Sequence, residues 1–317
     1  MPGLDLLLAR DPSTATWNAL VDRLDDPEHP PSPELLARAR TTLARWPAAL
    51  ARPLPYHWIS RLAAGDFPPA ALADALCLGD RWALDPGVTL DHFATLPRAR
   101  LPDLCARLPA LRLLDVSCQT ADNPYSPGTM LYHVDDLAHF LDAPPFTNLV
   151  GLDLSGTGLD LAAIDHILEH HPQLRSLALA VGDSDSFDDD DDWPALLDLP
   201  GLARLEQLEL GNMGRSADAM RTLLTCPHLG NLQRLVYTPE ATILREDGLD
   251  DREFTALLAA AAFAPAIRQK LRQDHAESSP SFTPGALFSP IFPGPPGRPF
   301  ARANDANDAN DASENDD

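Results

Sequence analysis

The chain has 317 residues, of which 44% are apolar, and this is enough for one large globular domain or two small ones. Its formal net charge is −23, and a net charge of −10 remains when the acidic runs at 183–192 and 304–317 are set aside. Nucleic acids and anionic membranes need patches of Lys and Arg, so an acidic chain of this kind argues against both as partners. The charge favours a protein partner with a basic or polar surface.

The N-terminal segment and the cysteines predict a cytoplasmic protein. The opening "MPGLDLLLARD" has no basic segment, and its apolar run is too short for a signal peptide. No stretch approaches the roughly 20 apolar residues of a membrane span. The cysteines show no close pairing in the sequence, and we expect buried, reduced thiols at Cys77, Cys105, Cys118 and Cys226.

Residues 1–80 are predicted to form a helical N-terminal cap. The segments 14–26 and 32–46 have helical apolar spacing, with Ser32 as the N-cap and Pro33 at the first helical position. The stretch "FPPAALADALCLGD" at 67–80 is predicted to be another short helix. The tryptophans of this region are expected to pack in the core of the cap, namely Trp17, Trp46, Trp58 and Trp82.

A pattern L-x-x-L-x-apolar recurs five times along residues 111–237. The copies begin at Leu111, Leu149, Leu174, Leu205 and Leu232, with spacings of 38, 25, 31 and 27 residues. The fourth and sixth positions alternate as in a strand with one buried face. A helix-like segment follows each copy, and because one strand and one helix cannot bury their apolar faces alone, several units must stack. A degenerate first repeat, with its strand in "VTLDH", is expected within 81–108.

These copies resemble the leucine-rich repeat family, in its ribonuclease-inhibitor-like branch and with degenerate repeats of a bacterial type. "LLTCPHLGNLQRL" and "LEHHPQLRSLAL" look like that branch's helix end, Pro turn and following strand, and the resemblance covers about 109–263. The longer signature departs from the family, because Thr157 stands in its Asn place and the other copies have Gln119, Gly182, Met213 and Glu240 there.

The resemblance implies an α/β solenoid with a curved parallel sheet inside and helices outside. We expect the solenoid, with its closing helices, over 81–276, and a helix pair broken at Pro265 to end it. Residues 277–317 are Pro-rich and then acidic and of low complexity, so we expect a disordered tail. Its scattered apolar residues are expected to lie loosely on the solenoid, and a short partner-binding motif in the tail is the alternative.

The motif "HILEH" at 166–170 matches the zinc-hydrolase pattern H-x-x-E-H, in which His166 and His170 share a helix face and Glu169 acts as base. No third ligand at a persuasive spacing is evident in the sequence. The interpretation we favour is therefore a solvated face of an outer helix. No cofactor and no metal are predicted.

The acidic run at 183–192 fails the calcium-loop pattern. A start at Asp183 puts Phe187, Asp188 and Pro194 at positions 5, 6 and 12, where a ligand, a glycine and a glutamate are needed. We predict a solvated loop, with irregular weak calcium binding as the alternative.

Function is predicted from the position of side chains in the repeats. The third and fifth positions of each L-x-x-L-x-apolar copy point away from the core. Carboxylates at Asp115, Asp153 and Glu209 are therefore expected on one open, concave face. The two long repeats carry their extra residues after the strand, at the same edge of the sheet, where insertions in repeat proteins often bind partners. The predicted partner-binding residues are Asp115, Asp153, Gln207, Glu209, Arg234, Tyr125, Tyr132, Asp185 and Asp188.

The sequence thus predicts a non-catalytic protein-interaction scaffold. No nucleophile motif and no phosphate-binding glycine loop is evident. The alternative is a metal-dependent enzyme or ion sensor that uses the 166–170 helix or the 183–192 run. A structural component whose tails recruit partners is a third possibility.

Overall fold

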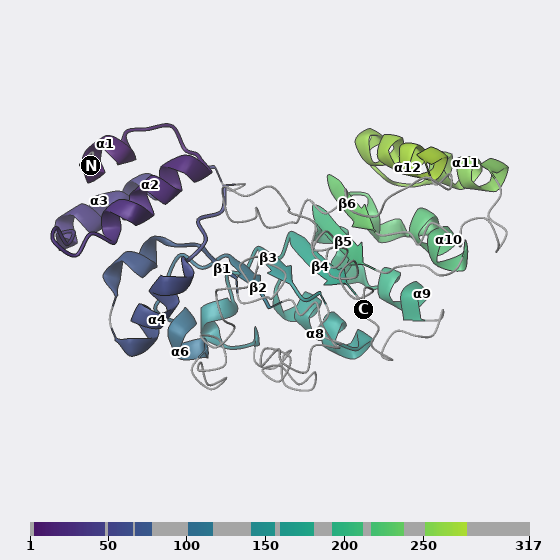
Figure 1. Ribbon diagram of the computed structural model, residues 1–317. Coiled ribbons are helices and arrows are strands. Elements are labelled where there is room, and N and C mark those ends of the chain that lie inside the picture. Colours follow the sequence, from purple (N-terminus) through teal and green to yellow (C-terminus); the bar gives the residue numbers. More distant parts are fainter. Residues whose placement is uncertain are drawn as a thin grey trace, which may run out of the picture.

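A six-stranded parallel sheet forms the centre of the molecule in the computed structural model (Figure 1). The structure describes residues 3–47, 50–65, 67–77, 101–116, 141–155, 159–180, 192–211, 217–237 and 251–277. The strands are β1 Ala75–Cys77, β2 Leu113–Asp115, β3 Gly151–Asp153, β4 Ser176–Ala180, β5 Gln207–Gly211 and β6 Arg234–Tyr237. They lie in the sheet in the order in which they occur in the sequence, and each neighbouring pair is parallel. The predicted α/β class with a parallel sheet is confirmed.

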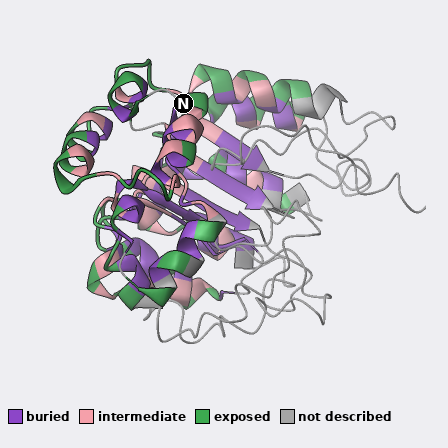
Figure 2. Ribbon diagram, turned by 60° about the vertical axis from the view of Figure 1, so that its left-hand side comes forward, coloured by how far each residue is buried: buried purple, intermediate pink, exposed green. Residues whose placement is uncertain are grey.

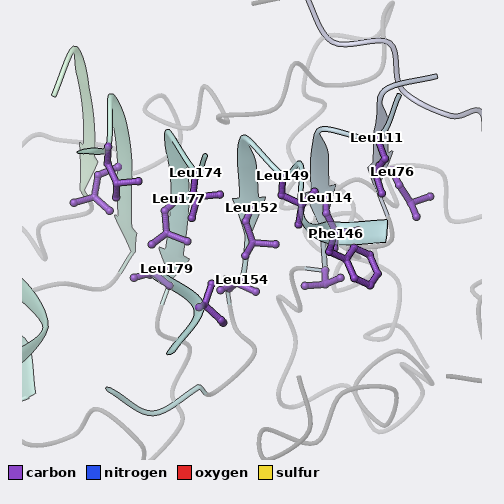
Figure 3. Packing of buried hydrophobic residues seen from close by; sticks show 14 of the residues in the cluster. Leu76, Leu111, Leu114, Phe146, Leu149, Leu152, Leu154, Leu174, Leu177 and Leu179 are labelled. Atoms are coloured by element: carbon purple, nitrogen blue, oxygen red, sulfur yellow. The ribbon is translucent and has the colours of Figure 1, made fainter. Parts of the chain in front are cut away.

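The recurring leucines stack in register on one face of this sheet. Leu114 pairs with Leu152 across β2 and β3, and Leu152 pairs with Leu177 across β3 and β4. These side chains are fully buried. Figure 3 shows them from close by, together with the leucines that precede the strands and with Leu154 and Leu179 at the sixth position. The core of the molecule is therefore built from the same positions of successive copies, as the alternating pattern predicts.

Helices follow the strands and pack against one another in a row. They are α6 Leu101–Cys105, α8 Leu161–His170, α9 Asp192–Leu197, α10 Ala217–Thr225 and α11 Asp251–Ala260. Helix α8 contacts α9, α9 contacts α10, and α10 contacts α11. In α8 the side chains of Ile164, Ile167 and Leu168 are buried, whereas Asp165 and Glu169 are exposed. The short 3-10 helices η5 Pro144–Phe146, η7 Pro200–Arg204 and η8 Pro227–Leu229 precede strands. Figure 2 shows that helices bury one face and expose the other.

The N-terminal region is helical, as predicted. It contains α1 Leu4–Leu8, α2 Thr14–Leu24, α3 Pro33–Leu43, α4 Tyr56–Ala64 and the 3-10 helix η1 Pro68–Leu72. Ser32 is the N-cap of α3, and its hydroxyl accepts a hydrogen bond from Leu35 N at 3.3 Å. Trp17, Trp46 and Trp58 are buried, which confirms their expected place in the core. Trp82 lies outside the described residues.

The short helix predicted at 67–80 is wrong in its second half. Within the described residues 67–77 only η1 is helical, and the chain then forms β1 at Ala75–Cys77, so the sheet begins within the range predicted for the cap. Pairing with β2 makes this segment a strand. Arg112 N and Leu113 N donate hydrogen bonds to the carbonyl oxygen of Asp74, at 2.8 and 3.0 Å, and these bonds hold β2 beside β1. Such tertiary contacts override a local helical pattern. The strand predicted in "VTLDH" lies outside the described residues.

The closing helix pair is confirmed at α11 and α12 Pro265–Glu277, where Pro265 is the first residue of the second helix. The disordered tail is predicted over 277–317, of which Glu277 is the last residue of α12 and residues 278–317 lie outside the described part of the chain. None of the helices in the described part combines the length and the apolar character that crossing a membrane requires.

Candidate functional site

Two rows of side chains run across the sheet on the face opposite the leucines. We call them the third-position row and the fifth-position row, after their place in each copy. The third-position row consists of Ala75, Leu113, Gly151, Ser176, Gln207 and Arg234, and the fifth-position row consists of Asp115, Asp153, Ala178, Glu209 and Val236. Side chains alternate between the faces of a strand, so both rows point away from the leucine core.

The expectation that three carboxylates lie on an open face is wrong. The exposed fractions of Asp115, Asp153 and Glu209 are 0%, 0% and 1%. Asp153 has a local role, because its Oδ1 accepts a hydrogen bond from Ser155 N at 3.0 Å, just beyond the end of β3. Strand alternation determines the face to which a side chain points, but it does not show what covers that face. These three residues are therefore buried groups of the fold and not the open surface that the alternation led us to expect.

The third-position row remains accessible at its C-terminal end. Ser176, Gln207 and Arg234 are half-buried and follow one another across β4, β5 and β6. At the other end of the row, Ala75 and Gly151 are buried. Toward β1 the row is apolar, with a half-buried Leu113 between the buried Ala75 and Gly151, and toward β6 it is polar and half-buried.

Four predicted contact residues, Tyr125, Tyr132, Asp185 and Asp188, lie outside the described residues, as does most of the acidic run. The chain leaves β2 at Asp115 and β4 at Ala180 to enter these segments. Both exits are at the carboxyl edge of the sheet, because the strands are parallel.

A second group of polar side chains lies on α8. The rings of His166 and His170 stack, with centroids 3.9 Å apart and an angle of 25° between the planes. His166 is half-buried and His170 is exposed, which agrees with the predicted outer helix face. The structure adds Asp142, whose two carboxylate oxygens both lie 3.0 Å from His166 Nε2. One ligating atom from each of the three residues lies within 4.8 Å of the others.

Sequence reasoning missed Asp142 as the third member of this cluster. It precedes η5 and β3, whereas α8 follows β3, so the strand separates them in the chain by 24 residues. The available signal was the repeat itself, because the segments before and after one strand return to the same helical layer. An aspartate at the end of the segment "DDLAHFLDA" was therefore a candidate neighbour of the next helix.

His171 lies next to this cluster, at the C-cap of α8, with an exposed fraction of 2%. Burial lowers the pKa of His171, and the nearby charge of Asp142 opposes this effect while His170 and His166 reinforce it. The net lowering of its pKa favours a neutral imidazole at His171.

The thiols of Cys105 and Cys226 are poorly suited to act as nucleophiles. Cys105 and Cys226 are buried and free, which confirms the prediction for these two. Burial raises the pKa of the Cys105 thiol to about 12, so the thiolate is scarce at neutral pH. Cys226 Sγ donates to Leu197 O at 3.0 Å, and burial raises its pKa as well.

Comparisons with protein-family models, with curated proteins and with solved structures found no match. The polar end of the third-position row and the cluster on α8 are therefore the observations that bear on function.

Proposed function

We propose that the chain is a leucine-rich-repeat solenoid that acts as a non-catalytic scaffold and binds a protein partner. The observation that supports this most strongly is the register of the sheet, in which the same position of each of the five copies pairs from β2 to β6 and β1 pairs in parallel with β2. A second support is the row of contacts from α8 to α11, which repeats at the same interval as the strands. A chain built in this way presents equivalent side chains at regular steps along an extended surface, which suits recognition of another protein.

The binding surface that we propose begins at the polar end of the third-position row. Ser176, Gln207 and Arg234 are adjacent in the sheet and half-buried, so they are accessible and yet held by their strands. Side chains on rigid strands lose little freedom on binding, and this lowers the entropic cost of association. Asp115, Asp153 and Glu209 are no longer included, because they are buried.

The proposed surface extends to the carboxyl edge of the sheet. The chain enters the segments that carry Tyr125, Tyr132, Asp185 and Asp188 from this edge. Aromatic residues are enriched at protein interfaces, and acidic ones attract a partner of opposite charge. With a net charge of −23, the chain favours a partner whose surface is basic or polar.

The experiment compares two double variants of the full chain as bait for partner capture. Gln207→Ala combined with Arg234→Ala removes the polar end of the row, and Arg272→Ala combined with Gln273→Ala removes the same residue types from the exposed side of α12. Once a partner is captured, its affinity is measured by titration. We expect the first variant to weaken binding by about tenfold or more, since truncating a central interface residue costs at least about 1 kcal/mol.

The proposed surface is wrong if both double variants bind the captured partner as well as the unaltered chain does. A chain truncated after Ser278 separates this proposal from recruitment by the tail. If the truncated chain loses the partner and the Gln207/Arg234 variant keeps it, the tail and not the sheet carries the interaction.

A further inference from the structure

We propose that Asp142, His166 and His170 form a binding site for a divalent transition-metal ion of the zinc type. This site is independent of the proposed protein-binding surface, because it lies on the helical layer and not on the sheet face. Three ligating atoms from these residues already lie within 4.8 Å of one another. Two of the residues come from one turn of α8, and the third comes from the segment before β3.

The hydrogen bond of His170 leaves its outer nitrogen available as a ligand. His170 Nδ1 lies 2.9 Å from the carbonyl oxygen of His166. A carbonyl oxygen can only accept, so Nδ1 donates its proton, and in the neutral imidazole Nε2 then carries the lone pair. A hydrogen bond of this kind from the second ring nitrogen is the usual way in which proteins orient a metal-binding histidine.

His166, the second histidine ligand, faces the carboxylate of Asp142 at close to the spacing that two ligands of one zinc ion keep. His166 Nε2 lies 3.0 Å from each oxygen of Asp142. A zinc ion bound at about 2.1 Å to a nitrogen and an oxygen, at the tetrahedral angle of about 109°, holds those two atoms about 3.4 Å apart, so the pair would open by about 0.4 Å to admit the ion. The ion would take the place of the proton between them. In the neutral ring that proton moves to Nδ1, and Nε2 becomes the ligand.

The donor set and its position in the fold favour a zinc-type ion. Two imidazoles and one carboxylate suit zinc and its neighbours, whereas calcium and magnesium prefer oxygen ligands. His170 is the last residue of the ten-residue helix α8, and the partial negative charge at a helix C-terminus favours a cation. Asp165 and Glu169 on the same helix add negative charge nearby. Three protein ligands leave a coordination position for water or for a further ligand.

A bound ion would link two segments that lie on either side of β3 in the sequence. Asp142 lies before the strand and α8 lies after it, so an ion held by both would clamp one repeat unit. An ion that binds only the folded chain stabilises it by mass action. The expected consequence is a rise in thermal stability with zinc concentration.

The experiment is zinc binding to the full chain after chelator treatment and dialysis. Bound zinc is measured by elemental analysis, affinity by competition with a chromophoric chelator, and thermal unfolding is followed with and without zinc. We expect one zinc ion per chain, a raised unfolding midpoint, and no displacement by a large excess of magnesium. His170→Gln changes an exposed side chain, and we expect it to lower the affinity by about tenfold or more.

The matched control is His228→Gln. His228 Nε2 lies 3.9 Å from Asp198 Oδ1, so this pair also combines a histidine with a carboxylate, but among the described residues it belongs to no group of three. We expect this variant to bind zinc as the unaltered chain does. The proposal is overturned if the unaltered chain binds no zinc. It is also overturned if His170→Gln retains full affinity, because the ion would then be bound elsewhere, for example by the acidic runs.

Discussion

The helical N-terminal region and the sheet region are held together in different ways. In the sheet, the same contact is repeated, as Leu114, Leu152 and Leu177 stack in register across three strands. In the helical region, each contact is individual. Trp58 packs edge-on against Phe67, with centroids 5.2 Å apart, and its indole N–H donates to Asp25 Oδ1 at 2.7 Å. Trp17 donates its own indole N–H to Pro53 O at 3.1 Å.

The buried aspartate Asp74 contacts arginines of both regions. Asp74 has an exposed fraction of 1%, and its carboxylate accepts hydrogen bonds from Arg52 N at 2.6 Å and from the guanidinium of Arg112 at 2.9 Å. The guanidinium of Arg52 also lies 2.9 Å from Asp74 Oδ2, and burial lowers the pKa of this arginine while Asp74 opposes the effect. The sheet region is therefore stabilised by one leucine contact that recurs from strand to strand. The junction with the non-repeating helical region is stabilised instead by an individual set of hydrogen bonds and ion pairs around Asp74.

The largest effect is expected from Asp74→Ala, which breaks the junction. The change leaves the buried Arg52 without its carboxylate, and losing one member of a buried ion pair costs about 3–5 kcal/mol of unfolding free energy. The measurement is unfolding in denaturant, followed by tryptophan fluorescence and by circular dichroism. If the junction holds the regions together, the two signals should also separate into different transitions.

Asp5→Ala serves as the control for this variant. Asp5 pairs with Arg38, and both side chains are more than half exposed, so the loss should stay within about 1 kcal/mol. Equal losses in the two variants would contradict the role assigned to Asp74.

A slightly smaller effect is expected from Leu152→Ala in the centre of the sheet. Leu152 is fully buried and pairs with leucines on both neighbouring strands, so its truncation should cost about 2–5 kcal/mol. Leu6→Ala makes the same chemical change in α1, at a side chain whose exposed fraction is 66%, and should stay within about 0.5 kcal/mol. Denaturant midpoints at unchanged slope measure both, and similar values for the two would show that the stacked leucines do not form the core.

The smallest effects are expected from removing one helix cap in each region. Ser13 Oγ accepts from Thr16 N at 3.1 Å at the start of α2, and Asp160 Oδ1 accepts from Ala163 N at 2.8 Å at the start of α8. Replacing either residue with Ala should cost about 1 kcal/mol. Thermal unfolding measures whether both variants shift one common transition, as expected for regions joined at Asp74. If each variant shifts a separate transition, the regions unfold independently.

The regular part of this protein can be predicted from its amino-acid sequence. The L-x-x-L-x-apolar copies predict the strands β2 to β6, their leucine core and the helices α8 to α11, because burial of one face imposes a period that can be counted along the chain. The cap at Ser32 and the break at Pro265 follow from local backbone chemistry, and the structure places both where they were expected. These features depend on residues close together in the sequence.

Tertiary structure alone decided the rest. β1 forms within a segment with a helical pattern, because pairing with β2 outweighs local preference. The carboxylates of Asp115, Asp153 and Glu209 are buried, since alternation sets the direction of a side chain and distant parts of the chain set its exposure. Asp142 meets His166 across a strand, at a sequence distance for which no motif spacing exists. In each case the deciding contact joins residues far apart in the chain, and the local pattern around each residue does not specify its partner.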